Sequence, residues 1–428
     1  MTSTDLRANP ARRVLSGNRG RVLGAAVLAS ALTGPGQTIG VSVFIDHFIS
    51  DLSVTREQVS GAYLIGTLIA STFLPSVGRI IDRYGVRRSQ VVIGAVFALV
   101  LINMSTVSGL VTLTIGFIGI RLLGQGSLSL VSTVTVSLRF NEDRGTALGL
   151  YSTLSAGLLA MAPIALGFGI SSVGWRSTWL IAAAVIAATV IPLGWFGLAS
   201  MPKNSAAVSE IEGPSTADVT SSDADTRDEA VTRSEAVRTR GFWILVSISG
   251  SASMLSTALN FHQIDLLTSA GLSETAAAAM FIPQVIGSSI AGFGFGVLID
   301  RVGGRWIPMA AVSLLVVAHL LASIVSPGLV VFAYAISLGA AGGAIRTVAS
   351  ALIPAWYGTG QLGSIQGTLT TIGVGLSAIG PLALALLESS TGSYSTSVLI
   401  LAAIPVAAAL FSLTGPARHR SGSGTTDN

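Results

Sequence analysis

The chain has 428 residues, of which half are apolar, a tenth are charged and none is cysteine. A soluble domain carries roughly a quarter charged residues, so this composition excludes an ordinary water-soluble globular protein. The absence of cysteine excludes disulfides, thiolate catalysis and zinc–thiolate sites, and the formal charge of +4 must be explained by where the basic residues lie.

The first 21 residues are polar and rich in arginine, and they precede an apolar stretch that contains the letters ASA. A cleaved signal peptide has the same combination of features. The apolar stretch continues past Pro35, however, and many more such stretches follow. We therefore interpret it as a retained first membrane span behind a cytoplasmic tail.

Apolar runs long enough to cross a bilayer, on the order of 20 residues, recur along the whole chain. In lipid every backbone polar group must be bonded within the protein, so these runs are predicted to be helices. The predicted spans are 22–45, 58–79, 89–108, 110–136, 146–170, 177–199, 242–267, 275–299, 306–325, 328–352, 361–387 and 395–415. The predicted fold is an all-α polytopic membrane protein with twelve transmembrane helices.

Residues 200–240 interrupt this pattern, because they are polar and contain almost no large apolar side chain. Such a segment has no means of burying a core, so we predict a flexible cytoplasmic linker. Six predicted spans lie on each side of it. The predicted organisation is an N-terminal tail (1–21), a six-helix bundle (22–199), the linker (200–240), a second six-helix bundle (241–415) and a cytoplasmic tail (416–428).

The basic residues set the predicted orientation, because cytoplasmic loops carry an excess of arginine and lysine. With both termini inside, Arg56 and Arg176 are the basic residues that fall in outer loops, and Arg121 and Arg346 fall within spans. The other basic residues lie on the cytoplasmic side. This bias explains the high isoelectric point without a nucleic-acid partner.

The two halves of the chain repeat each other at a spacing of 218 residues. GRIIDRYGVR at 78–87 matches GVLIDRVGGR at 296–305, and Gly149 and Pro163 align with Gly367 and Pro381. A slightly shifted register pairs FID at 44–46 with QID at 263–265. Parallel repeats related by an axis along the membrane normal are one architecture of secondary transporters. We therefore expect two bundles related by pseudo-two-fold symmetry.

The loop after the second span, G-x-x-x-D-R-x-G-x-R-R, and its echo after the eighth span resemble the signature loop of the major facilitator superfamily. The resemblance covers residues from about 21 to 415, and it implies a transporter that works by alternating access. It also implies that these loops latch the halves together on the cytoplasmic side; the alternative is that their arginines only set topology. The candidate gating residues are Gly78, Asp82, Arg83, Gly85, Arg87, Asp300, Arg301 and Arg305.

Two arginines at membrane depth are candidate substrate ligands, because a charge there costs roughly 2.5–3.5 kcal/mol on insertion scales. Arg121, in IGFIGIRLLGQGSLS, resembles the superfamily's arginine of the fourth span; a structural bond to the first span is the alternative. Arg346, in GAAGGAIRTVAS, has no counterpart in the repeat. The guanidinium fork suits carboxylate or phosphate groups, so Arg346 is the preferred anion ligand, against a purely structural salt link.

Polar residues of the first and seventh spans complete the candidate substrate site. Gln37 follows Pro35, which removes a backbone donor and loosens the helix; close packing through the neighbouring glycines is the alternative. Asn260, His262 and Gln263 cluster in the seventh span. His262 is a candidate proton carrier, and the alternative is an interfacial histidine.

An enzyme is not expected. The single lysine, Lys203, follows no Gly-rich phosphate loop, GFGFG at 292–296 lies within a predicted span, and no metal-ligand pattern recurs. No cofactor or metal is therefore predicted.

The predicted function is secondary active transport of a small organic anion such as a monocarboxylate, with protons as a candidate co-substrate. The alternatives are a proton-coupled efflux pump for lipophilic drugs and a solute sensor that does not transport. The glycine- and proline-rich fifth-span motif of antiporters is matched only in part around Pro163. The expected partners are the solute and the lipid bilayer, the expected state is a monomer, and the expected location is a bacterial inner membrane.

Overall fold

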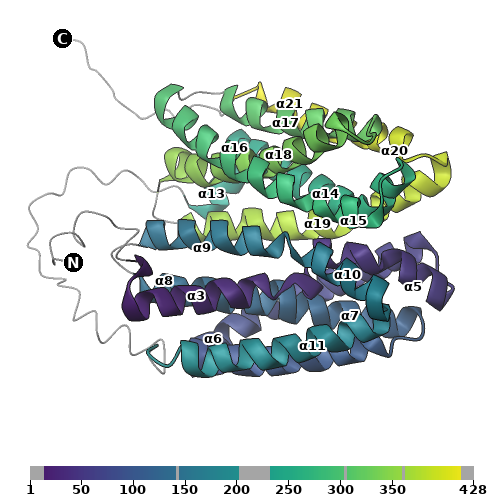
Figure 1. Cartoon of the computed structure of the whole chain (residues 1–428). Coiled ribbons are helices and arrows are strands. Elements are labelled where there is room, and N and C mark those ends of the chain that lie inside the picture. The colour runs from purple at the N-terminus through teal and green to yellow at the C-terminus, as the bar shows by residue number, and fades with distance from the viewer. Residues whose placement is uncertain (1–13, 141–143, 202–231, 303–305, 359–361, 416–428) are drawn as a thin grey trace, which may run out of the picture.

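The computed structural model describes residues 14–140, 144–201, 232–302, 306–358 and 362–415, and these form helices joined by short turns (Figure 1). In chain order they are α3 (Gly17–Ala31), the 3₁₀ turn η1 (Gly34–Gly36), α4 (Thr38–Val41), the 3₁₀ turn η2 (Ser42–Phe44), α5 (Ile45–Leu52), α6 (Arg56–Ser105), α7 (Leu110–Ile120), the π-helix η3 (Arg121–Leu128), α8 (Ser129–Arg139), α9 (Arg144–Leu159), α10 (Ala162–Val173), α11 (Trp175–Pro192), the π-helix η4 (Leu193–Gly197), α13 (Arg233–Arg238), α14 (Arg240–Ser269), α15 (Glu274–Ala279), α16 (Phe281–Val302), α17 (Trp306–Ser323), α18 (Leu329–Tyr357), α19 (Leu362–Thr391), α20 (Tyr394–Leu401) and α21 (Ala403–Ser412).

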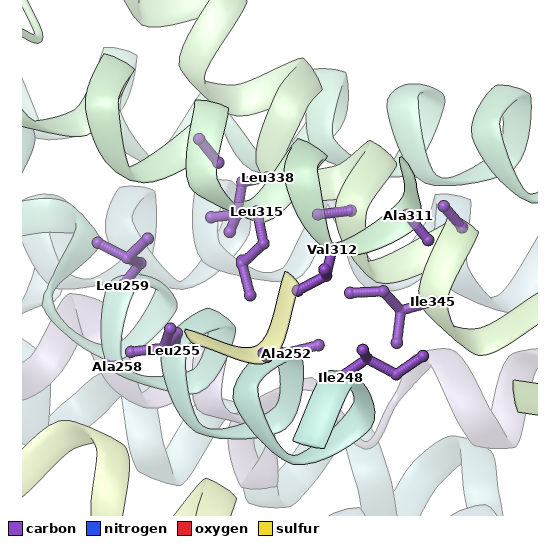
Figure 2. Packing of buried hydrophobic residues seen from close by; sticks show 14 of the residues in the cluster. Ile248, Ala252, Leu255, Ala258, Leu259, Ala311, Val312, Leu315, Leu338 and Ile345 are labelled. Carbon is purple, nitrogen blue, oxygen red and sulfur yellow. The ribbon is translucent and has the colours of Figure 1, made fainter. Parts of the chain in front are cut away.

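The chain forms two helical bundles that lie side by side, one from α3 to η4 and one from α13 to α21 (Figure 1). Each bundle has an apolar core of its own. In the C-terminal bundle Leu255, Leu315 and Leu338 bring α14, α17 and α18 into one core (Figure 2). We call the end of the molecule where α3 and α14 begin the inner end, and the end that carries α5 and α20 the outer end. The predicted two-bundle architecture is confirmed.

The helix lengths agree with the predicted spans. Ten helices of the described residues are long and apolar enough to cross a membrane, or eleven if a bent pair counts as one span. α6 has 50 residues, about 75 Å at helical rise, which is more than twice the hydrocarbon thickness of about 30 Å. It breaks at Gly85, whose φ of 77° lies outside the helical region, so it contains two of the predicted spans, 58–79 and 89–108.

The first span is discontinuous around Pro35, as the sequence predicts. α3 ends at Ala31, a 3₁₀ turn carries Pro35, and the segments on either side are bent by 45°. Gly36 also packs closely, because a Cβ there would overlap the Ile120 carbonyl in the fourth span. The break around Pro35 and the close packing at Gly36 therefore occur together.

The two bundles contact each other mainly through α6 with α19, α10 with α15, and α14 with α4 and η2. The short elements α10 and α15 lie toward the outer end of the molecule (Figure 1), and α4 and η2 directly precede α5 in the chain. Of the predicted linker, residues 202–231 lie outside the described part of the chain. Its last residues form α13, which is capped by the Thr232 hydroxyl.

Candidate functional site

A central cavity lies between the two bundles. It consists of two adjoining pockets with volumes of about 420 and 570 Å³, which share Ser256, Asn260, Gly342 and Arg346. α14, α18 and α19 line the first pocket, together with Thr38 and Gln125 of the N-terminal bundle; α9 and α16 line much of the second. Because both bundles contribute to its wall, the cavity is the place where a relative movement of the bundles changes access.

A larger hollow of about 830 Å³ lies within the N-terminal bundle, between α3, α10 and α11. Its lining is almost wholly apolar and includes Leu28, Leu158 and Phe196, and it contains no charged residue. Acyl chains of lipid suit such a surface, and the two threonine hydroxyls in its lining, Thr178 and Thr189, are already bonded to backbone carbonyls. The candidate site is therefore the central cavity.

α14 carries two adjacent stripes of different character. Leu255 and Leu259 belong to the apolar stripe, which also includes Ile248 and Ala252 and faces the core of the C-terminal bundle (Figure 2). The next stripe round the helix is polar and faces the cavity. Its members, at spacings of four, three and four residues, are Ser249, Ser253, Ser256 and Asn260. This helical spacing is the local reason that α14 presents a row of polar side chains to the cavity.

Arg346 projects into the central cavity from α18, about 16 Å from the inner end of that helix at Tyr357. Its side chain is exposed to the cavity. Among the described residues it makes no ion pair and no side-chain hydrogen bond, and neither pocket has an acidic residue in its lining. The cavity therefore holds a positive charge that the described protein leaves unneutralised.

Glycines fix the orientation of the helix that carries Arg346. A Cβ at Gly339 would overlap the Gln284 carbonyl, and one at Gly343 would overlap the Ser288 carbonyl. α18 and α16 therefore approach to backbone contact along this face. Since Arg346 lies three residues after Gly343, this contact holds its side chain toward the cavity.

Four polar atoms at the cavity wall lack partners. They are the Gln125 Oε1, Ser249 Oγ, Ser256 Oγ and Asn260 Oδ1 atoms, each buried and without a hydrogen-bond partner among the described residues. A buried polar atom that stays unpaired costs about 1–3 kcal/mol. Their concentration at one cavity indicates that a bound solute or water supplies the missing hydrogen bonds.

Arg121 lies behind the cavity wall, and its Nε and Nη1 groups are bonded within the N-terminal bundle. Its side chain is 5% exposed; its Nε donates to the Thr67 hydroxyl at 3.1 Å and its Nη1 to the Gly36 carbonyl at 3.4 Å. Its guanidinium also lies 4.7 Å from the ring centroid of Tyr63. Arg121 is not in the lining of either pocket. The observed contacts match the structural alternative, a bond to the first span.

The other predicted substrate ligands separate into two groups. Asn260 lines both pockets, so the structure brings it together with Arg346. Gln37 lines neither pocket, because its amide donates to the Thr33 hydroxyl at 2.9 Å; the next residue, Thr38, lines the cavity instead. The helix restarts at Thr38, which turns that side chain and not Gln37 toward the cavity.

His262 and Gln263 are fully buried and lie outside the cavity lining. The His262 Nε2 atom lies 2.9 Å from the Pro381 carbonyl, which joins α14 to α19. Gln263 donates to the Ala277 carbonyl and accepts from Gln284, which lines the second pocket. In this conformation neither residue reaches a solute in the cavity directly.

An ion-pair cluster that was not predicted from the sequence joins the two bundles at the outer end. Thr55 and Gln58 form a capping box that places Arg56 at the first position of α6. The Arg56 Nη2 atom lies 2.6 Å from Asp46 Oδ1 in its own bundle and 3.1 Å from Asp265 Oδ2 in the other. Asp265 also accepts a hydrogen bond from Tyr394. We call these four residues, Arg56, Asp46, Asp265 and Tyr394, the outer latch.

An aromatic contact closes the cavity beneath the outer latch. The rings of Tyr63 and Phe261, one from each bundle, have centroids 4.6 Å apart. Both side chains are completely buried, and Phe261 packs into the core of the N-terminal bundle. At the other end the lining extends to Gln366, about one helical turn from the inner end of α19. The cavity is thus closed at the outer end and extends toward the inner end.

The predicted inner gating residues make few contacts between the bundles in this conformation. Asp82 is exposed and has no ion pair among the described residues, and Gly78 borders open space. Arg87 donates to the Trp195 carbonyl at 3.1 Å within its own bundle, and Arg83 lies over the ring of Tyr84. Gly85 provides the left-handed turn of the loop.

In the second copy of the loop, Arg301 is exposed. Arg305 and the side chain of Asp300 lie outside the described part of the chain. An unlatched inner loop agrees with a cavity that extends toward the inner end.

Two signals in the sequence pointed to the residues that were missed. The repeat pairs Asp46 with Asp265, the two carboxylates that share Arg56. The polar stripe of α14 follows a four-three-four spacing, of which only Asn260 was recognised. No pattern in the sequence predicts the ion pair between Arg56 and Asp265, because this pair depends on how α5, α6 and α14 pack together.

Comparison with known proteins agrees with this architecture. A bacterial homologue of the human lysosomal transporter Spinster, in an inward-facing and unoccupied conformation, superposes with a TM-score of 0.73 at 16% identity, over 93% of this chain and 97% of that one. The nucleoside transporter NupG gives 0.71 at 14% identity, over 92% and 98%. At such identities these likenesses show the fold alone.

The glucose transporter GlcP of Staphylococcus epidermidis is 27% identical over 165 residues, which cover 38% of this chain and only 36% of that protein. The sequence profile of the Major Facilitator Superfamily matches residues 25–287, more than half of the chain. With its two bundles, central cavity and many apolar helices, the chain belongs to the Major Facilitator Superfamily and is a multi-pass membrane transporter.

Proposed function

We propose that this transporter carries a small organic anion, such as a monocarboxylate, by alternating access, and that Arg346 binds the anionic group. The observation that carries the proposal is the Arg346 guanidinium, which has no acidic partner among the described residues that line the cavity. A charge at membrane depth is costly, so a solute that neutralises it gains binding energy. The planar fork of donors suits a carboxylate in particular.

The lining argues against the efflux of lipophilic cations. A site for such compounds needs an extended apolar wall and an acidic group. The central cavity has apolar side chains in its wall, but its described lining has no acidic residue and includes Arg346 together with hydroxyl and amide groups of α14 and α19. A cation would be repelled by Arg346 and would leave the hydroxyl groups unpaired.

In the proposed cycle the bundles rock about the cavity. The conformation described here is closed by the outer latch and by Tyr63 against Phe261. Opening outward requires the Arg56–Asp265 ion pair to break, after which Arg56 keeps Asp46 as its partner. The inner loops, with Asp82, Gly85 and Arg87, and their second copy, with Asp300, Arg301 and Arg305, would then close the inner side.

Protons are the proposed co-substrate, since symport of a monoanion with one proton moves no net charge. We propose a monomer in a bacterial inner membrane as the working form. His262 stays the candidate proton carrier, although its Nε2 atom is engaged with the Pro381 carbonyl in this conformation. Proton uptake by His262 would therefore require movement of α14 against α19.

Uptake into liposomes tests the proposal. The purified protein is reconstituted, and radiolabelled acetate, lactate and gluconate are offered with and without an inward proton gradient. Glucose and tetraphenylphosphonium serve as neutral and cationic probes. We expect saturable uptake of one or more of the carboxylates that increases with the proton gradient. Uptake of tetraphenylphosphonium alone would refute the proposal.

Variants of Arg346 assign the role of the charge. Loss of a charge-assisted hydrogen bond costs about 1.5–3 kcal/mol, so Arg346→Ala should weaken apparent affinity roughly ten- to hundredfold, with Arg346→Lys between it and the parent protein. Arg240→Gln removes an exposed arginine at the start of α14 and is the matched control. An Arg346→Ala protein that transports the anion as well as the control does would remove Arg346 from the site.

A neutral sugar is the second candidate. The hydroxyl-rich stripe of α14 favours it, as does the likeness to a glucose transporter over part of the chain. On this reading Arg346 would donate to sugar hydroxyls. Saturable glucose uptake without carboxylate uptake would select it.

A further inference from the structure

The unpaired polar atoms of the central cavity carry information about the solute beyond its charge. Arg346 can neutralise one anionic group, but it leaves the separate set of unpartnered atoms on Gln125, Ser249, Ser256 and Asn260 unsatisfied. A simple alkyl carboxylate has no further groups with which to satisfy them. A solute that carries several donors and acceptors of its own can take the place of water at these atoms.

The arrangement of these atoms describes an extended track. From Ser249 to Asn260 the polar stripe of α14 rises about 16 Å, with Ser253 and Ser256 between its ends. A second polar stripe belongs to α19, at spacings of four and seven residues, and consists of Gln366, Thr370 and Ser377. Both stripes line the pocket that contains Arg346, so hydroxyl groups from two helices share this pocket with the positive charge.

The chemistry of the track favours hydroxyl groups over further charges. Serine and threonine hydroxyls and side-chain amides both donate and accept hydrogen bonds, and none of them neutralises charge. Of the described residues that line the two pockets, Arg346 alone is charged. A solute with one anionic group and a hydroxylated chain matches both features, whereas a dianion would leave its second charge without a cation.

We infer that the preferred solute is a polyhydroxylated monocarboxylate, a sugar acid in chemical class, with its carboxylate on Arg346 and its hydroxyl groups along the α14 track. This inference rests on the proposed anion transport and specifies its substrate. Ser256 and Asn260 are the two polar residues that both pockets share with Arg346, and each carries an unpaired buried atom. We therefore expect these two residues to make the most selective contacts with the hydroxyl groups. A site built to bond hydroxyl groups discriminates strongly against analogues that lack them.

Matched pairs of carboxylates separate the substrate class from the charge. Uptake of radiolabelled gluconate into proteoliposomes is competed with hexanoate, which has the same chain length and charge without the hydroxyl groups, and with glucose, which has hydroxyl groups without the charge. We expect unlabelled gluconate to compete at least tenfold better than either analogue, since each unmade hydrogen bond costs about a factor of ten.

Variants of the track provide the second readout. Ser256→Ala and Asn260→Leu should raise the KM for gluconate roughly tenfold each and leave competition by hexanoate unchanged. Ser313→Ala, which removes a hydroxyl bonded to the Met309 carbonyl in α17 away from the cavity, is the control and should change neither.

The outcomes separate the two proposals. The sugar-acid inference would be overturned if hexanoate competed as well as gluconate, or if the Ser256→Ala and Asn260→Leu variants had an unchanged KM for gluconate. Either result would leave anion transport standing. Anion transport and the sugar-acid inference would both be overturned if glucose competed as strongly as gluconate and uptake persisted in the Arg346→Ala variant.

Discussion

The outer latch gives the most direct test of the proposed cycle, through the variant Asp265→Asn. This change removes the charge that Arg56 meets across the bundle interface. Arg56 keeps its ion pair with Asp46, so no buried cation is left unpaired. The asparagine oxygen can still accept the Tyr394 hydroxyl hydrogen bond, so the local packing is preserved. The variant therefore weakens the contact between the bundles with little effect within either one.

The size of the effect follows from the exposure of the pair. The side chains of Arg56 and Asp265 are 17% and 28% exposed, so their ion pair lies between a surface pair and a desolvated one. Surface pairs contribute about 0.2–1 kcal/mol and charge-assisted hydrogen bonds about 1.5–3 kcal/mol, and we take about 1 kcal/mol for this pair. That corresponds to an increase of about fivefold in the ratio of outward-open to inward-open protein.

Asp46→Asn is the matched control, and its expected effect has the opposite sign. Asp46 is the partner that Arg56 keeps when the bundles separate. Without Asp46, separation leaves the Arg56 cation unpaired, so opening costs more and the inward-open form gains population. Because both variants remove one carboxylate from the same arginine, a general effect of lost negative charge would move them in the same direction.

The populations can be measured by spin-label distances, because the natural chain has no cysteine to interfere. Labels at Ser108→Cys and Ser326→Cys, exposed positions in outer loops of the two bundles, report the separation of the outer ends. We expect a larger long-distance fraction for Asp265→Asn and a smaller one for Asp46→Asn. Distance distributions that are identical in the two variants, or shifted the same way, would refute the latch.

Three further variants test the packing that positions the site. Arg121→Leu leaves the buried Gly36 carbonyl unbonded, so thermal unfolding in detergent should show a free energy of unfolding lower by about 1–3 kcal/mol, with an unchanged KM for the solute. A raised KM at full stability would instead make Arg121 a ligand. Gly343→Val should reduce the yield of monodisperse protein on size exclusion, because the valine side chain would overlap the backbone of α16. The control Gly342→Ala, whose added methyl group meets open space, should not reduce it, and equal yields would contradict the close packing. Gly85→Ala should lower stability by about 1–3 kcal/mol in the same thermal assay, since an alanine at a φ of 77° is strained, and an unchanged melting temperature would count against that turn.

Much of the architecture could be predicted because membrane helices leave strong local signals. Long apolar runs predicted the spans, Pro35 predicted the broken first helix, and the repeat predicted two bundles. Arg346 was predicted to bind the solute because an uncompensated charge at membrane depth is rare whatever the surrounding fold. The structure places it in the cavity without a partner, and its role stays a prediction until transport is measured.

Other site residues could not be predicted, because their roles depend on which way a side chain points. Gln37 and Thr38 are neighbours, and only the restart of the helix at Thr38 decides which one reaches the cavity. His262 and Asn260 are two positions apart on α14, which places them on different faces, one against Pro381 and one in the cavity. Span boundaries alone do not give these rotations.

The sequence by itself determined the membrane class, the duplicated bundles and the unusual charge at Arg346, since each follows from composition or from spacing along one helix. The tertiary structure decided which polar residues share a cavity, how Arg121 is satisfied and how Arg56 joins Asp46 to Asp265. Those features arise between helices that are far apart in the chain. Their geometry is set by the glycine contacts and core packing that fix the rotation of each helix, and a pattern within a single helix does not contain that information.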